Sequence, residues 1–531
     1  MLLCWFTPQN RRRRYIKCRI SNTIKEYRVG GDRNMNPNEM NLEPQVTLGS
    51  ERGGVIDEPI FQLLMLGNWA GDGSRHSLDR RRPIEIDRDN FDDVMKGIGV
   101  RLNISIGESM IDLIFNSIDD FHPDEIYKNV PLFAELRDLR KRLRNADTFN
   151  SAAREVREWS KSDGPERTEK IEEPVTESTT IAPGNLLDSI LSETEGGGAA
   201  AKSAVSNDLS RLVGKIVRPH LVSVDEDEQF KMLQAVDDAT SSLMRGLLHD
   251  SSFQELESAW RGLFFLVRRT DTSSDLRLFI LDVSKDELAE DLRSADGSQV
   301  VSRIASGRSE DPFAAVFGNF AFEPTVDDVA TLIRIAQASA RLKTPFVSHI
   351  TPKVFGIESF LDHTDPEDWD LSGESSERKL WTAMTEIPET KYLGLAMPRF
   401  LVRLPYGAET EPLETFSFEE FTETFSHEDY LWANPVFAVA QMLAKTYTEC
   451  GWDFGNRFSQ DVEGLPLHFY KRDGQSIYLP CAEVQLSQNA SDKLADQGVM
   501  PLVSFKDADR IRLVRFRSVC QSETSLAGRW R

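Results

Sequence analysis

The sequence has few cysteines and no long apolar run. The five cysteines form no CxxC pair, and their scattered positions are typical of free thiols in a reducing compartment: Cys4, Cys18, Cys450, Cys481 and Cys520. No stretch approaches the roughly 20 apolar residues that a membrane-spanning helix needs. The polar segment that follows the basic start does not fit a secretory signal. We therefore expect a cytoplasmic protein without membrane insertion.

Basic residues are outnumbered by acidic ones. The chain has 63 Lys and Arg against 86 Asp and Glu, a formal net charge of −23, so its surface as a whole is unsuited to nucleic acid. Residues 1–45 are the exception, with the basic run Arg11–Arg14. This segment fits either a small nucleic-acid or lipid-binding arm, or an upstream extension that never orders, with Met35 or Met40 as the working start. We favour the disordered extension.

The usual signatures of catalysis and cofactor binding are missing. The sequence has no P-loop, no GxGxxG after a strand, no HExxH, no paired CxxC and no GxSxG elbow. Its eight histidines are scattered, and two that lie close to prolines, His122 and His349, fit turn or core positions better than site positions. The sequence thus predicts no cofactor, no metal site and no enzyme.

Composition divides the rest of the chain into three parts. Strand and helix patterns alternate in residues 46–146 and again in 208–531, as in FQLLMLGNWAG, PFAAVFGNFAF and VDDVATLIRIAQASARL. Residues 147–207 are rich in Ser, Thr, Glu and Gly, which is typical of a flexible linker. We expect an α/β fold, with mixed sheets and flanking helices.

Four aspartates cluster before and within a predicted helix that carries Phe91: Asp87, Asp89, Asp92 and Asp93. Carboxylates at a helix start favour the helix dipole, and Asp89 or Asn90 can cap the helix. We prefer this capping role to metal binding.

The linker contains one amphipathic stretch, NLLDSIL. Leu186, Leu187, Ile190 and Leu191 form one apolar stripe at helical spacing. About two turns of helix are not stable alone, so the stripe fits a docking peptide. Chance apolar content explains the pattern equally well.

The stretch KYLGLAMPRFLVRLPYG places two arginines four residues apart. We expect Arg399 and Arg403 to lie on one face of a strand that prolines bound at its ends. There they can pair with carboxylates of this acidic chain or, in an enzyme, clamp a phosphate.

Several blocks together resemble the contractile sheath of the bacterial type VI secretion system. PIEIDRDNFDDVMKGIGVRL and IDDFHPDEIYKNVPLFAELRDLRKRL are similar to the small sheath subunit, TssB or VipA. FQELESAWRGLFFLV, LFILDVSKDELAEDL, KYLGLAMPRFLVRLPYG and LWANPVFAVAQMLAKTYTECGWDF are similar to the large subunit, TssC or VipB. The chain therefore resembles a natural fusion of both subunits, which implies the sheath heterodimer fold within one chain.

The resemblance implies a structural role. In the family, copies of the heterodimer stack as a helical tube around an inner Hcp tube, assemble on baseplate components and contract to drive the inner tube outward. The AAA+ unfoldase ClpV then recycles the sheath. The expected partners are further copies of this chain, an Hcp-like tube, a baseplate and a ClpV-like unfoldase.

The resemblance also implies roles for particular residues. A short helix near the start of the family's large subunit binds the unfoldase after contraction, and the NLLDSIL stripe lies at about that place. The PRFLVRLPYG-like block belongs to the large-subunit core, which favours a structural role for its arginines. We group six residues as an assembly or core motif: Arg399, Arg403, Trp260, Arg261, Asp87 and Asp89.

One departure leaves alternatives open. The family's large subunit continues past VRFRSVCQSETSLAGRWR with an RFxHY-like block, which this sequence lacks. Either a separate chain supplies that region, or the sheath contacts differ, or the product is truncated or divergent. The alternative to a sheath subunit is a non-polymerising adaptor or scaffold derived from the sheath heterodimer. A third hypothesis is an enzyme that uses Arg399, Arg403 and the aspartates on a phosphorylated ligand.

Overall fold

The computed structural model divides the chain into two units, Met1–Glu58 and Pro59–Arg531. The structure describes residues 3–6, 14–20, 23–29, 59–106, 109–161, 228–294, 297–306, 312–371, 374–422, 425–454, 457–472, 474–522 and 525–530. In the first unit, three strands form an antiparallel sheet in the order β1-β2-β3 (Leu3–Phe6, Arg14–Ile20 and Thr23–Val29). They lie within the extension for which the sequence predicts disorder. RYIKCRI and TIKEYRV each mix charged residues with β-branched or aromatic ones, a composition that suits strands.

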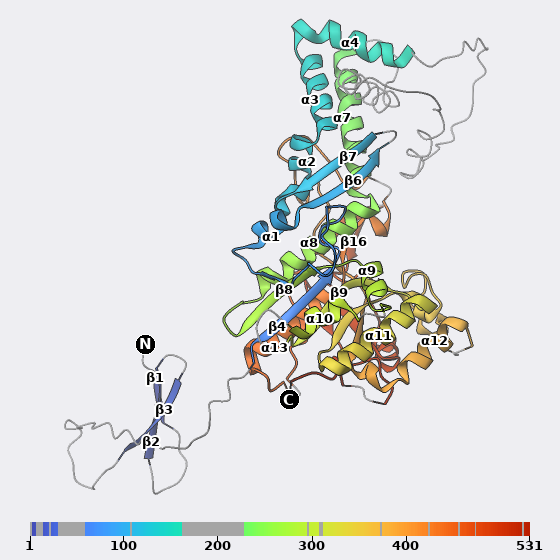
Figure 1. Ribbon diagram of the computed structural model, residues 1–531. Coiled ribbons are helices and arrows are strands. Elements are labelled where there is room, and N and C mark those ends of the chain that lie inside the picture. Colours follow the sequence, from blue (N-terminus) through green and yellow to red (C-terminus); the bar gives the residue numbers. More distant parts are fainter. Residues whose placement is uncertain are drawn as a thin grey trace, which may run out of the picture. The chain divides into compact units, whose positions relative to one another are not determined.

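A nine-stranded mixed sheet forms the centre of the second unit (Figure 1). The strands from β17 to β8 run parallel, and antiparallel strands lie at both ends. With helices on both faces, this sheet confirms the predicted α/β class. In spatial order the strands are β14 (Asp461–Val462), β18 (Ile511–Leu513), β17 (Val499–Ser504), β11 (Leu393–Met397), β10 (Phe346–Ile350), β9 (Ala315–Phe322), β4 (Phe61–Gly67), β8 (Leu276–Asp282) and β5 (Ile84–Ile86).

The two sequence blocks share this sheet. Strand β4 comes from the first block but pairs with β8 on one side and with β9 on the other. All seven residues of β4 are buried, as expected for a central parallel strand. The backbone hydrogen bonds of β4 therefore go to the second block. Removing β4 would leave the facing backbone groups of β8 and β9 without partners.

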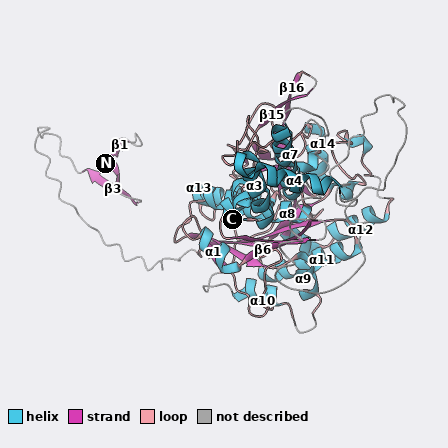
Figure 2. Cartoon of the chain, turned by 90° about the horizontal axis from the view of Figure 1, so that it is seen from above, coloured by secondary structure: helices cyan, strands magenta, loops and turns pink. Residues whose placement is uncertain are grey.

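Alternate residues of β4 enter two different hydrophobic cores. Phe61, Leu63 and Met65 join the core beneath one helix layer, whereas Leu64 and Leu66 join the other. The first layer contains α8 (Ser251–Arg269) and α13 (Val436–Cys450). The second contains α9 (Lys285–Asp291), α10 (Gln299–Ser306), α11 (Val326–Leu342), α12 (Ser376–Thr385) and α14 (Gln488–Asp496). Figure 2 shows α8 and α11 on opposite sides of the strands.

Three helices project away from the large sheet (Figure 1). Helix α3 (Pro131–Arg144) packs on α4 (Ala146–Lys161) and α7 (Glu228–Leu248). Helix α4 occupies the start of the predicted linker, because Ala152, Ala153 and Val156 form a buried stripe. Residues 162–227, which contain the rest of that linker, lie outside the described part of the chain.

The remaining elements are short or lie beside the sheet. Two antiparallel hairpins are formed by β6 (Val100–Ile106) with β7 (Ser109–Phe115), and by β15 (His468–Arg472) with β16 (Gln475–Leu479). Strand β12 (Phe400–Leu401) pairs with β13 (Trp432–Ala433). The other helices are α1 (Phe91–Ile98), α2 (Pro123–Asn129), η1 (Ile118–Phe121), η3 (Pro352–Phe355), η4 (Pro366–Asp368), η5 (Pro388–Tyr392) and η6 (His427–Asp429). Among the described residues, no helix is both long and apolar enough to cross a lipid bilayer.

Candidate functional site

Arg403 lies at the centre of a buried ionic network. Its side chain is only 4% exposed, and it contacts carboxylates from two distant parts of the chain. Arg403 Nε lies 3.0 Å from Glu257 Oε1 on α8, and Nη1 lies 2.8 Å from Glu420 Oε2 in a loop. Both glutamate side chains are fully buried. The network therefore ties the loop after β12 to a core helix.

Arg261 and Tyr406 complete this network. Arg261 donates from Nε to Glu257 Oε1 at 2.6 Å and from Nη2 to the Tyr406 hydroxyl at 2.9 Å. The Arg403 guanidinium carbon lies 4.5 Å from the centroid of the Tyr406 ring, a cation–π contact. Two arginines thus face two carboxylates, so the formal charges balance within the core.

The pKa shifts reflect this pairing. Burial alone would raise the pKa of Glu420, but Arg403, His249 and the backbone N–H of Tyr406 lower it to about 2. Burial alone would lower the pKa of Arg403, yet Glu257 and Glu420 raise it well above its usual value. Burial raises the pKa of Tyr406, so its hydroxyl stays protonated. These groups keep fixed charges at neutral pH and suit a structural contact better than proton transfer.

Arg399 forms a second network with different carboxylates. Its Nε lies 3.0 Å from Glu483 Oε2, and its Nη2 lies 2.6 Å from Glu483 Oε1. Nη2 also donates to Glu428 Oε2 at 2.9 Å. The backbone N–H of Arg399 also donates to Glu483 Oε2 at 3.1 Å, and the backbone N–H of Glu483 donates to the Arg399 carbonyl oxygen at 2.9 Å. A phosphate would have to displace these carboxylates to reach either Arg399 or Arg403.

The prediction that both arginines lie on one strand is wrong. Strand β12 contains only Phe400 and Leu401, so Arg399 precedes it and Arg403 follows it. Pro398 and Arg399 lie between the end of β11 at Met397 and the start of β12 at Phe400. The two arginines therefore meet different partners, although both pair with carboxylates.

The two histidines considered from the sequence lie in the core and at a helix start. His349 is 6% exposed, its Nδ1 lies 2.9 Å from the Ala396 carbonyl oxygen, and burial lowers its pKa to about 4. His122 caps α2, where its ring nitrogen accepts from the Asp124 N–H at 3.2 Å. The His122 ring also packs edge to face on Tyr406, at 4.9 Å. No group of three potential metal-ligand side chains is present in the described residues.

Trp260 joins the two sequence blocks. Its indole N–H donates to the Trp69 carbonyl oxygen at 3.0 Å, and the two indoles pack edge to face at 5.6 Å. Phe91 of α1 also packs edge to face against Trp260, with ring centroids 5.7 Å apart. Helix α8 thus presents Trp260 to the first block and the neighbouring Arg261 to the Arg403 network.

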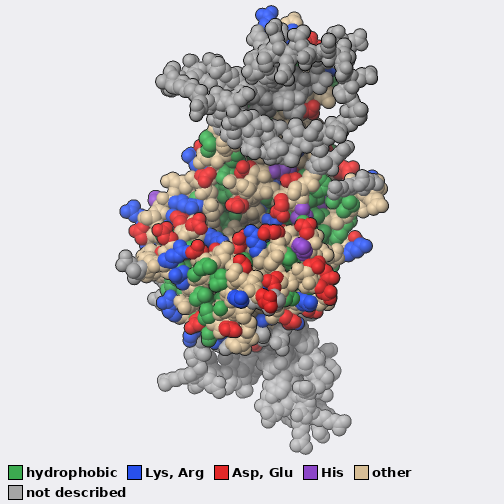
Figure 3. Space-filling model, turned by 90° about the vertical axis from the view of Figure 1, so that its right-hand side faces the viewer, with side chains coloured by type: hydrophobic (Ala, Val, Ile, Leu, Met, Phe, Trp, Pro, Cys, Tyr) green, Lys and Arg blue, Asp and Glu red, His purple; other side chains and the backbone are tan. Residues whose placement is uncertain are grey.

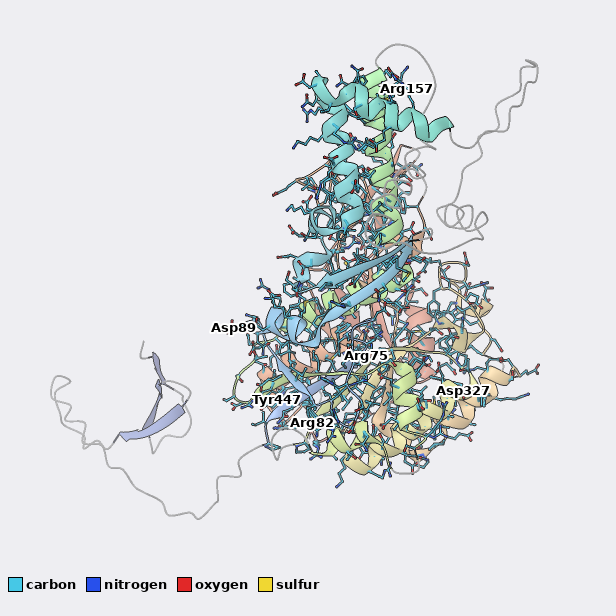
Figure 4. All side chains as sticks on the ribbon, turned by 45° about the horizontal axis from the view of Figure 1, so that its top comes forward. Arg75, Arg82, Asp89, Arg157, Asp327 and Tyr447 are labelled. Atoms are coloured by element: carbon cyan, nitrogen blue, oxygen red, sulfur yellow. The ribbon has the colours of Figure 1, made fainter. Side chains whose placement is uncertain are left out.

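Asp87 and Asp89 lie at the turn before α1. Asp87 Oδ1 accepts from the backbone N–H groups of Asp89 and Asn90, at 2.9 and 3.0 Å. Asn90 occupies the N-cap position but its side chain bonds no helical N–H. Asp92 and Asp93 lie in the first turn, which favours the helix dipole. Asp89 is exposed (Figure 4), and it is not among the ion-pair partners of Arg399 or Arg403 in the described residues.

A third network, around Asp282, was missed from the sequence. Asp282 ends β8, and its Oδ1 accepts from the Trp69 and Ala70 N–H groups at 2.8 and 3.1 Å. Its Oδ2 lies 3.1 Å from Arg75 Nε. Arg81 pairs with Glu287 at 2.7 Å, and this contact lowers the pKa of Glu287 to about 2.

This Asp282 network lies at the carboxyl ends of β4 and β8, where open α/β sheets often bind ligands. Here Trp69, Arg75 and Arg81 from the first block contact the second block instead. Figure 4 labels Arg75 of this network. In the sequence, the one feature that could have indicated this network is the aspartate that directly follows the apolar residues of LFILDVSK. Leu186, Leu187, Ile190 and Leu191 of the predicted docking helix lie outside the described residues.

Comparisons with known proteins match both halves of the chain. Residues 230–520 match the family described as EvpB/VC_A0108, tail sheath N-terminal domain. Residues 45–158 match the family described as Type VI secretion system, VipA, VC_A0107 or Hcp2. A curated relative, the type VI secretion system sheath protein TssC1 of Pseudomonas aeruginosa strain PAO1, is 31% identical over 348 residues. That alignment covers 63% of this chain and 69% of the relative.

Both matches include residues of the networks described above. Arg403 and its carboxylates lie in the large-subunit match, whereas Arg75 and Arg81 lie in the small-subunit match and contact the large one. The chain therefore belongs to the type VI secretion system sheath family and carries small-subunit and large-subunit domains in one polypeptide.

Proposed function

We propose that this chain is a structural subunit of a contractile type VI secretion sheath. It polymerises around an Hcp-like inner tube in the cytoplasm, on baseplate components, and contracts to propel that tube. The observation that carries the proposal is β4, a small-subunit strand held between two large-subunit strands. One folded unit thus contains both parts of the sheath heterodimer.

The domains have distinct roles in this proposal. Residues 46–146 act as the small sheath subunit and 208–531 as the large one, with 147–207 as their connection. Fusion fixes a one-to-one ratio and raises the effective concentration of the two parts. After contraction, Leu186, Leu187, Ile190 and Leu191 dock on a ClpV-like unfoldase.

The buried networks support a mechanical role over a catalytic one. A sheath stores energy in lattice contacts and releases it by a rigid-body change of subunit position. Such a subunit needs loops fixed to its core, and Arg403 and Arg399 provide this through bonds to carboxylates. On the face in Figure 3, acidic and basic side chains are interspersed, which suits polar contacts between copies.

Negative-stain electron microscopy of the purified chain, alone and co-expressed with an Hcp-like protein, tests the proposal. We expect tubes, and light scattering should show assembly that rises with protein concentration. Uniform small particles under all conditions would contradict polymerisation and favour the non-polymerising adaptor. A thermal melt on the same sample separates this outcome from misfolding.

A further inference from the structure

A small polar pocket lies between α12, the end of α14 and the C-terminal segment around residue 519. Its volume is about 100 Å³, well above the ~10–15 Å³ that a single water molecule needs. Seven polar residues contribute to its lining: Arg378, Thr382, Thr385, Asp496, Gln497, Arg517 and Gln521. The pocket is separate from the Arg403, Arg399 and Asp282 networks.

Arg378 is buried here without a matching carboxylate. The residue is 5% exposed, and its Nη2 donates to Gln497 Oε1, a neutral acceptor. Its Nε and Nη1 are buried and have no hydrogen-bond partner in the described part of the chain. Burial lowers the pKa of Arg378 more than the charge of Asp370 raises it. A buried guanidinium with unpaired donors is costly, since native proteins pair such groups.

Arg517 adds a second buried positive charge. It is 7% exposed, and its donors reach the backbone carbonyls of Ser518 and Ala495. Asp496, the one carboxylate in the lining, bonds the exposed Arg515 at 3.2 Å, and its own side chain is 65% exposed. Burial, followed by repulsion from Arg515, lowers the pKa of Arg517.

Among the described residues, the buried Arg403 and the partly buried Arg399 have carboxylate partners, in contrast to Arg378 and Arg517. Arg403 contacts two carboxylates, and Arg399 also contacts two. Only at this pocket do two arginines, each more than nine-tenths buried, line one space with no carboxylate bonded to either in the described residues. Charge balance therefore calls for an anion from outside the chain.

We infer that this pocket binds one small tetrahedral oxyanion, phosphate or sulfate, between Arg378 and Arg517. Charge-assisted hydrogen bonds from guanidinium groups suit such oxygens, and the Thr382 hydroxyl and Gln521 amide can add neutral donors. The exposed Asp496 carboxylate can accept a hydrogen bond from the P–OH group of hydrogen phosphate, which favours phosphate over the fully ionised sulfate. Bound anion would hold α12, α14 and the C-terminal segment together. This inference is independent of the proposed polymerisation.

Isothermal titration of the full chain with inorganic phosphate, in a buffer matched for ionic strength with chloride, tests the site. We expect saturable one-to-one binding and a melting temperature that rises with phosphate concentration. Sulfate is titrated separately and then in competition, to establish which anion is preferred. Absence of any phosphate or sulfate effect beyond that of chloride would overturn the inference.

Three variants sharpen this test. Arg378→Met should weaken anion binding by about tenfold or more, because it removes charge-assisted bonds. Gln497→Glu places a carboxylate on Arg378, so it should raise the melting temperature in anion-free buffer and weaken phosphate binding. Arg341→Met, at an exposed position on α11, should bind like the parent chain. Unchanged binding in both pocket variants would overturn the inference, and the Gln497→Glu melt shows whether that variant folds.

Discussion

Trp260 donates its indole N–H to the carbonyl oxygen of Trp69, 191 residues earlier in the chain, at 3.0 Å. The bond is buried and crosses from the large-subunit match to the small-subunit match. The same two residues pack edge to face. A single side chain therefore couples the two parts of the fold by both hydrogen bonding and packing.

Trp260→Phe should lower the free energy of unfolding by about 2–3 kcal/mol. The substitution leaves the buried Trp69 carbonyl without this donor and opens a cavity beside Phe91. Urea denaturation followed by circular dichroism measures the change. Trp530→Phe, at a half-buried position, should cost less, and equal losses in the two variants would contradict this account.

Arg403→Met should lower the free energy of unfolding by about 3–5 kcal/mol. It leaves Glu257 and Glu420 buried with part of their counter-charge removed. The matched control is Arg157→Met, because the Arg157–Glu228 pair is about half exposed and such pairs contribute about 0–1 kcal/mol (Figure 4). The same urea experiment compares the two. A loss at Arg403 no larger than that at Arg157 would show that the buried network is not a stabilising contact.

Stability should fall with acidification through a window set by Glu420. Its pKa is about 2 in the folded chain and near its ordinary value of 4.5 when unfolded, so between these values the unfolded state binds more protons. The contribution of Glu420 is therefore complete above about pH 4.5 and is lost as the pH falls toward 2. The urea midpoints of the parent chain and Glu420→Gln, measured from pH 7 to pH 3, should converge as the pH falls. A constant gap would contradict the assignment, and Glu228→Gln, at an exposed position, serves as the control.

Cutting the chain between its two family matches should not separate the parts. A specific protease site inserted at Gly196–Gly198 lies between residues 158 and 230, the facing ends of the matches. After cleavage, we expect both fragments to elute together in gel filtration, because β4 is paired on both edges within the sheet. Separate elution in native buffer would refute a shared core, whereas separation in urea is the positive control.

The NLLDSIL stripe should be required for unfoldase binding if the proposed recycling operates. Leu187→Asp with Ile190→Asp places charge on the apolar stripe and should abolish pull-down by the N-terminal domain of a ClpV-like unfoldase. Ser189→Asp adds charge on the polar side of the same predicted helix and should bind normally. Equal binding by all three chains would exclude the stripe as the docking element.

The sequence by itself determined the elements and the family. Apolar runs such as FQLLMLG and PFAAVFGNFAF correspond to β4 and β9, and helical spacing of Leu132, Phe133, Leu136 and Leu139 corresponds to the buried face of α3. These signals are local, because burial on one face imposes a period on the residues of a single element. The resemblance to both sheath subunits depended on the same uninterrupted stretches, and the family comparisons confirm it.

Only the tertiary structure decided which distant residues meet. Glu257 lies 146 positions from Arg403, and Asp282 lies 213 positions from the Trp69 N–H that it accepts, so no periodic pattern could pair them. The insertion of β4 between β8 and β9 is likewise a long-range pairing, between strands that lie far apart in the sequence. The same holds for Arg378 and Arg517, since their burial without carboxylates depends on three segments closing over one pocket. Local patterns fix what each segment becomes, whereas charge pairing and strand order follow from packing across the whole chain.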